Sequence, residues 1–63
     1  MNAIRALRKK MGITQKKLSE KIGCTDVTIS FWENNKHKPN ICYMKKIIKI
    51  AEKNGLRLSV HSF

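Results

Sequence analysis

The chain has 63 residues, and its 14 lysines and arginines outnumber its four acidic residues, which gives a formal net charge of +10 at pH 7. A chain of this length forms one domain with a small core, and no apolar run comes near the roughly 20 residues of a membrane span. Its two cysteines, Cys24 and Cys42, are too few for a disulfide framework and lack metal-ligand spacing, so we expect reduced thiols and no metal. These features predict a soluble cytoplasmic protein with no membrane partner.

The excess of positive charge creates a long-range field that attracts polyanions. DNA, RNA and an acidic membrane surface would all be attracted, and lysine-rich helices that are merely solvated would have the same composition. Charge alone therefore does not identify the partner, and the motifs must decide.

Four segments have the apolar spacing of helices, and each follows a residue that can accept hydrogen bonds from the free N–H groups of a first turn. The predicted helices span residues 3–11, 15–22, 26–34 and 41–53. The capping residues are, in the same order, Asn2, Thr14, Thr25 and Asn40. Gly12 and Gly23 can end the first two helices, and Asn35, which tolerates left-handed geometry, can end the third.

The end of the chain changes to a period of two. Leu56, Leu58 and Val60 alternate with polar residues, which predicts a half-buried strand over residues 56–63. Since the chain offers no second strand, we expect it to pair with its copy in a second chain, as an antiparallel ribbon at a dimer interface formed by those three residues. The alternative is a tail that docks on its own helices in irregular form, and Phe63 breaks the strict alternation.

The turn between the second and third predicted helices is short. Gly23 lies where the backbone is expected to take a positive φ, and two helices joined so tightly must cross steeply. Such an arrangement lets one helix lie across a DNA backbone while the next inserts its N-terminal residues into the major groove. Together with the net charge, the turn favours DNA as the partner.

This region, over about residues 4–51, resembles the Cro/CI-type helix-turn-helix family, also called Xre-like or lambda-repressor-like. The residues that carry the resemblance are Arg8, Gly12, Thr14, Gln15, Leu18, Gly23, Thr25, Thr28, Ile29, Ser30, Trp32, Glu33, Asn34, Lys36 and Pro39. The resemblance implies an all-α fold, with a compact four-helix DNA-binding domain over residues 1–55 and a short C-terminal β-strand over residues 56–63 that pairs across a dimer, as in some antitoxin-type members. Ser19, where the family usually has alanine, and Asn35, in place of the usual glycine, depart from the pattern.

The third predicted helix is expected to read the DNA bases. Periodicity leaves open which side faces the core, because the apolar pair Val27 and Phe31 lies on one side and Ile29 on another. The family pattern assigns Ile29 to the core, which leaves Val27 and Phe31 to contact thymine methyl groups. The expected base contacts are Asp26, Val27, Thr28 and Phe31. Asp26 can accept a hydrogen bond from cytosine, or it can serve only as a favourable charge at the helix start.

Other residues are expected from the resemblance to hold the DNA backbone, which gives affinity without sequence information. These residues are Gln15, Thr25, Ser30, Asn34, Lys36 and Lys38. For Gln15 and the two lysines the alternative is simple solvent exposure. Arg8 and Glu33 are expected to form a structural ion pair between the first helix and the end of the third.

We therefore expect a sequence-specific DNA-binding transcriptional regulator, a bacterial or phage repressor that binds a near-palindromic operator as a homodimer. Scattered acids, no nucleophile-base spacing and no glycine-rich phosphate loop argue against an enzyme and against a cofactor. Two alternatives stay open. One is an antitoxin that binds a toxin and regulates its own operon, and the other is a basic protein that coats nucleic acid without specificity.

Overall fold

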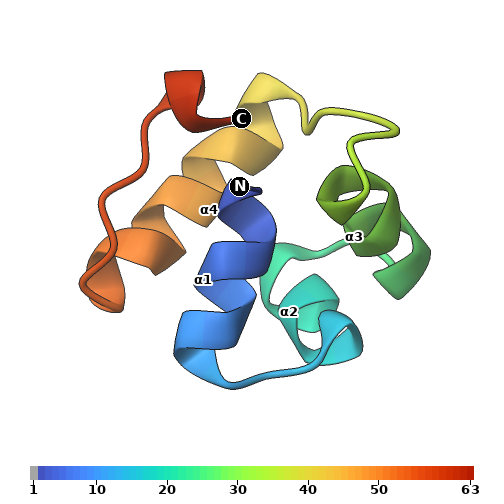
Figure 1. The fold of residues 1–63 in the computed structure, drawn as a ribbon, viewed down its shortest axis with the longest axis horizontal. Helices are drawn as coiled ribbons and strands as arrows, with labels where there is room; N and C mark the ends of the chain where they lie inside the picture. The colour runs from blue at the N-terminus through green and yellow to red at the C-terminus, as the bar shows by residue number, and fades with distance from the viewer. Residues whose placement is uncertain (1) are drawn as a thin grey trace.

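Each α-helix begins at the side chain that the sequence predicts as its cap. The computed structural model describes residues 2–63 and contains α1 (Ala3–Met11), α2 (Gln15–Ile22), α3 (Asp26–Glu33) and α4 (Ile41–Lys53), as Figure 1 shows. The side chains of Asn2, Thr14, Thr25 and Asn40 each accept a hydrogen bond from a backbone N–H of the following turn. The predicted all-α architecture of four helices is confirmed, and α3 ends one residue before its predicted end.

Two residues with left-handed backbone geometry set the path of the chain on either side of α3. Gly23, between α2 and α3, has a φ of 90°, and Asn35, after α3, has a φ of 58°. Asparagine is among the few residues other than glycine that adopt this geometry readily, which explains how Asn35 can stand in a position that favours glycine. The loop after α3 then continues to Pro39, which is buried.

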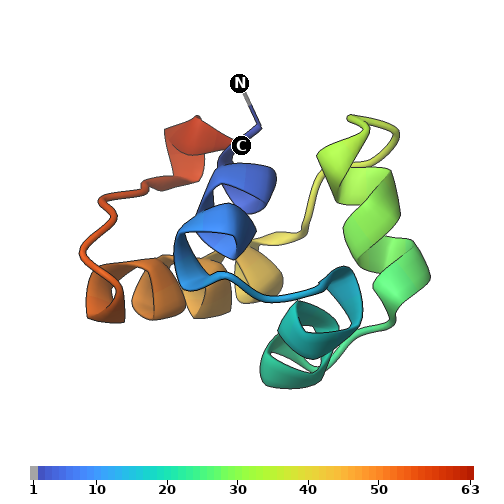
Figure 2. The ribbon, with the colours of Figure 1, turned by 60° about the horizontal axis from the view of Figure 1, so that its bottom comes forward.

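The core is small and every helix contributes to it equally. The buried apolar residues are Ile4 and Leu7 of α1, Leu18 and Ile22 of α2, Ile29 and Trp32 of α3, and Ile47 and Ala51 of α4. α2 packs mainly against α3. Figures 1 and 2 show α4 and the C-terminal tail on one side of α1 and α3 on the other side. α3 is therefore at the edge of the molecule, with one face on the core and another on the surface.

The predicted C-terminal strand is wrong. Within the described part of the chain no residue after Gly55 belongs to a strand, and Val60–Ser62 forms a 3-10 helix, η1. The backbone groups find local partners, because the Ser59 hydroxyl accepts from the N–H of His61 and the Ser62 hydroxyl accepts from the N–H of Ser59.

The apolar side chains of the tail face the chain's own core. Leu56, Leu58 and Phe63 pack against it, whereas Val60 is 42% exposed. Pairing of this segment with a second copy is therefore not supported, and the tail follows the alternative in which it docks on its own helices. Leu56 and Leu58 alternate with polar residues because every second side chain of this segment packs against the helical core. No sheet is involved within residues 2–63.

A buried carboxylate joins α1 to the end of α3. The Glu33 side chain is fully buried. Arg8 donates two hydrogen bonds to it, from Nε to Oε2 at 2.7 Å and from Nη2 to Oε1 at 3.0 Å. Arg5 adds a third bond, from Nε to Oε1 at 3.3 Å. Arg8 also donates from Nη1 to the carbonyl of Ile13 at 3.3 Å, so each of its three nitrogens makes a hydrogen bond inside the protein.

These contacts keep Glu33 ionised. Burial by itself raises the pKa of the Glu33 carboxyl, but the hydrogen bonds from Arg8 and Arg5, together with the nearby side chain of Gln15, outweigh burial and lower that pKa below its usual value. The same bond to Glu33 raises the pKa of Arg8. A buried charge that loses its partner is strongly unfavourable. The packing of α1 against the end of α3 therefore depends on the ion pairs of this carboxylate.

Replacing the carboxylate tests its role in stability. The folded-state pKa of Glu33 is lower than its unfolded-state value of about 4.3, so its contribution is fully present above that pH and is lost as pH falls through the folded-state pKa. Glu33→Gln should lower the free energy of unfolding at neutral pH by about 3 kcal/mol and flatten the acid-dependent loss of stability. Thermal unfolding at a series of pH values, followed by circular dichroism, measures both effects. Glu52→Gln, at an exposed position of α4, is the control and should keep the wild-type pH profile.

The docked tail makes a second prediction. Leu58→Ala removes apolar contact with the core and should lower the free energy of unfolding by about 1 kcal/mol, independently of protein concentration. Val60→Ala, at an exposed position in the same tail, should change it by much less. An effect of Leu58→Ala that appears only at high protein concentration would contradict docking within one chain.

Candidate nucleic-acid interface

The turn between α2 and α3 is fixed by the chain's own backbone. The carbonyl of Ser19 accepts from the N–H groups of Gly23 at 2.8 Å and Cys24 at 3.0 Å. The buried Ser19 hydroxyl donates to a carbonyl of α2 at 2.6 Å, so serine leaves no unsatisfied polar group there. From α4, Lys46 Nζ donates to the carbonyl of Ile22 at 3.4 Å. α3 is consequently held at a set orientation to α2.

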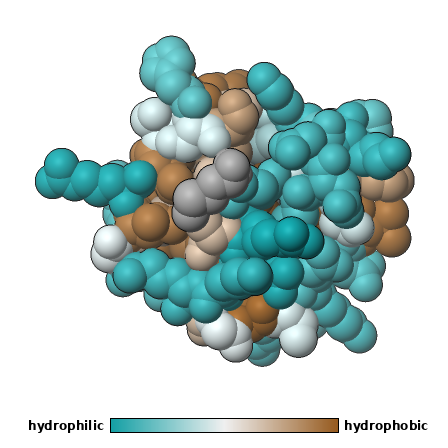
Figure 3. Space-filling view, viewed as in Figure 1, coloured by the Kyte–Doolittle hydropathy of each residue, from teal (hydrophilic) through white to brown (hydrophobic). Residues whose placement is uncertain are grey.

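The exposed face of α3 carries the apolar pair that periodicity could not orient. Ile29 is fully buried and Trp32 is 5% exposed, whereas Val27 is 56% and Phe31 is 43% exposed. The space-filling view in Figure 3 shows an apolar area at the side of the molecule where α3 lies, bordered by hydrophilic side chains. The structure thus directs Val27 and Phe31 outward, and their contact with bases remains an expectation.

The start of α3 carries three polar side chains in different environments. The Thr25 hydroxyl accepts from the Thr28 N–H at 3.2 Å and lies 2.9 Å from the Thr28 hydroxyl, so these two groups form part of the helix cap. Asp26 is exposed and forms no ion pair within residues 2–63. Its carboxylate is available to an external donor, while its place in the first turn also suits the positive end of the helix dipole.

The expected phosphate contacts lie on both sides of α3. Gln15 begins α2 and is partly buried, while Lys36 and Lys38 are exposed in the loop that follows α3. Asn34 Nδ2 donates to the Ser30 carbonyl at 2.8 Å and to the Ser30 hydroxyl at 3.3 Å, so its amide protons are used within the helix. Of these side chains, the two lysines have the freest donors.

His37, to which the sequence assigned no role, contacts the exposed face of α3. Its ring meets the ring of Phe31 edge-on, with centroids 5.3 Å apart and an interplanar angle of 76°. The two rings help to line an open pocket of about 320 Å³ that also includes Lys38 and Tyr43. The only sequence signal for this contact is the spacing of one aromatic residue near the end of a helix and another in the next loop.

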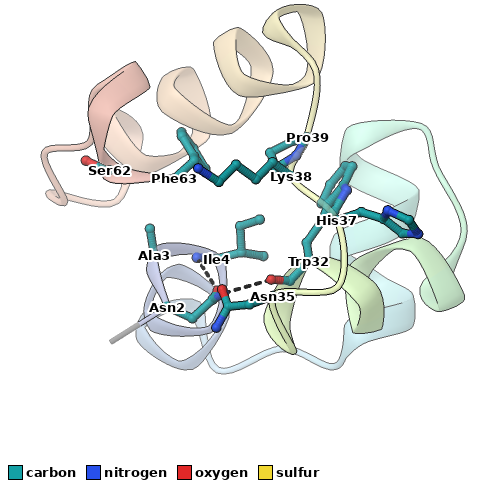
Figure 4. Close-up of a pocket in the computed structure, with 10 residues that line it drawn as sticks. All are labelled: Asn2, Ala3, Ile4, Trp32, Asn35, His37, Lys38, Pro39, Ser62 and Phe63. Carbon is teal, nitrogen blue, oxygen red and sulfur yellow. Dashed lines mark hydrogen bonds between the residues drawn. The ribbon is translucent and has the colours of Figure 1, made fainter.

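A second pocket lies on the other side of this loop, beside the start of α1 and the C-terminal tail. Its volume is about 280 Å³, and Figure 4 shows Asn2, Asn35, Lys38 and Phe63 around it. The Asn2 amide donates to the Trp32 carbonyl at 2.7 Å and to the Asn35 side chain at 3.2 Å. Its oxygen accepts from the first turn of α1, so one side chain caps the start of α1 and the end of α3.

Residues 2–63 contain neither a cluster of metal-binding side chains nor a helix that could span a membrane. No three histidine, cysteine or acidic side chains gather there in a way that could hold a metal ion. None of the helices is both long enough and apolar enough to cross a membrane. Cys24 and Cys42 are free, and burial raises the pKa of the Cys24 thiol more than the nearby charge of Lys46 lowers it.

Comparison with known proteins agrees with this geometry. A family model described as helix-turn-helix matches residues 4–59, which is most of the chain. Searches among curated proteins and among solved structures returned no match. The matched range includes all four helices except the first residue of α1, and it includes the fixed turn between α2 and α3. The chain belongs to the Cro/CI-type helix-turn-helix family of DNA-binding regulators.

Proposed function

We propose that the chain is a sequence-specific transcriptional repressor of bacterial or phage type, which reads duplex DNA with α3 and acts as a homodimer. The observation that carries this proposal is the exposed apolar pair Val27 and Phe31 on a helix whose opposite face is locked into the core. Thymine methyl groups are the apolar feature of the major groove, and they match such a pair. The net charge of +10 brings the helix to DNA.

Polar groups at the start of α3 would add hydrogen-bond specificity. Asp26 has a carboxylate free of ion pairs within residues 2–63, and a carboxylate can accept from the N4 amino group of cytosine. The Thr28 hydroxyl is held beside Thr25 and can contact a base edge or a phosphate. An acidic group and apolar groups on one recognition face would give this chain an operator preference of its own.

Residues before and after α3 in the chain would contact the phosphates of the DNA backbone. Gln15 at the start of α2 and the exposed Lys36 and Lys38 after α3 support this arrangement, together with the hydroxyls of Thr25 and Ser30. Asn34 is the weakest of the proposed backbone contacts, because its amide protons already bond within α3. These contacts would fix the register of α3 in the groove.

The size of the domain favours two copies on one operator. The Cα extents are 25 × 23 × 21 Å, whereas successive major grooves on one face of DNA lie about 34 Å apart. One copy can therefore enter one groove, and a near-palindromic site takes two copies. With the tail docked on its own core, we propose that neighbouring copies meet on DNA and not through paired strands.

Selection of bound duplexes from a randomised DNA library tests the proposed function. At near-physiological salt, where binding through phosphates alone is weakened, we expect enrichment of a two-fold symmetric site with half-sites about one helical turn apart. Retention of DNA without enrichment of any sequence would contradict a sequence-specific function and would indicate a basic protein that coats nucleic acid.

Substitutions on α3 test which side chains read the site. Phe31→Ala and Val27→Ala should each weaken binding to the selected site by about tenfold, because each removes apolar contact with a base. Binding to a scrambled duplex should change little. Val60→Ala is the control, since it truncates an exposed valine outside α3. Fluorescence anisotropy titrations with both duplexes measure these effects, and equal losses on both duplexes would contradict a role in base reading.

A further inference from the structure

Two arginines converge on one buried carboxylate, and this leaves one positive charge without a counterpart. The side chain of Arg8 is 19% exposed, and each of its three nitrogens donates to Glu33 or to the carbonyl of Ile13. Arg5 has a side chain that is 51% exposed and makes one contact with Glu33, through Nε at 3.3 Å. Arg8 alone would neutralise Glu33, so the fold does not require a second guanidinium for charge balance.

The free donors of Arg5 point to an external anion. A guanidinium has five N–H donors in a rigid planar fork, and Arg5 uses only its Nε within residues 2–63. Its terminal nitrogens have no protein acceptor among the described residues. Because Glu33 holds the guanidinium at one edge, the other edge is pre-organised, and a planar pair of donors suits a phosphate.

Arg5 bonds to a carboxylate that joins two of the segments proposed to hold the DNA backbone. Glu33 is the last residue of α3, directly before the loop that carries Lys36 and Lys38. The side chain of Gln15, at the start of α2, is close enough to Glu33 to lower the pKa of its carboxyl. The carboxylate that holds Arg5 therefore belongs to the end of α3 and lies near the start of α2.

We propose that Arg5 is a further contact to the DNA backbone, with Glu33 as the residue that orients its guanidinium toward a phosphodiester. This inference rests on the proposed function and adds a contact from α1, which the sequence did not single out. The contact carries no sequence information, because every duplex offers the same phosphates. Arg5 strengthens binding to operator and non-operator DNA alike.

Three variants separate a phosphate contact from a general charge effect. Arg5→Gln removes the charge and the donor fork, and Arg5→Lys keeps the charge but loses the fork. Lys53→Gln removes one charge at an exposed position and is the matched control, because Lys53 ends α4 and that end of the helix lies away from α3 (Figures 1 and 2). Each is titrated with the selected operator and with a scrambled duplex at several salt concentrations, after circular dichroism has measured its folded fraction.

Arg5→Gln should weaken binding to both duplexes by about tenfold and reduce the slope of log affinity against log salt by about 0.9. Arg5→Lys should keep the slope and lose part of the affinity, while Lys53→Gln should stay near wild type in both. If Arg5→Gln matches Lys53→Gln in affinity and slope while the wild type binds its operator, the inference is overturned and the proposed function stands. If the wild type binds neither duplex, both are overturned.

Discussion

The carboxylate of Glu33 is the interaction on which the rest of the domain depends. Hydrophobic burial is strong but has no direction, and a core with only two apolar residues from each helix could accommodate several packings. The Arg8 fork is directional, because two parallel hydrogen bonds fix the plane and the distance of both partners. Glu33 lies at the end of α3, so the constraint acts on the helix proposed to read DNA and ties it to α1.

α3 contributes both to the core of the fold and to the surface proposed to contact DNA. The helix has eight residues, about two turns, and its buried residues, Ile29, Trp32 and Glu33, are interspersed with exposed ones. Ile29 and Trp32 anchor it, and Val27 and Phe31, on the opposite face, are free to meet a ligand. Because the anchoring and the exposed residues are interleaved, the recognition face can change in sequence without loss of the contacts that hold the helix.

Features that depend on local chemistry could be predicted from the sequence, whereas features that depend on tertiary contacts could not. The four caps and the left-handed Asn35 follow from side-chain properties alone, so the helix starts could be predicted. The tail could not, because alternating leucines suit a sheet or a helical surface equally well. The apolar residues of α3 lie on two sides, so orientation needed the family pattern. The sequence does not distinguish Arg5 from the thirteen other lysines and arginines. Arg5 stands out only in the structure, through its contact with Glu33.

The double cap made by Asn2 has a consequence for local opening. Helix ends usually fray independently, with small opening free energies that hydrogen exchange can resolve. Here the side chain of Asn2 accepts from the first turn of α1 and donates to the carbonyl of Trp32 near the end of α3. Fraying of α1 at its start therefore also removes a hydrogen-bond donor from the end of α3, and this couples the opening of two helix ends that lie 30 residues apart in the chain.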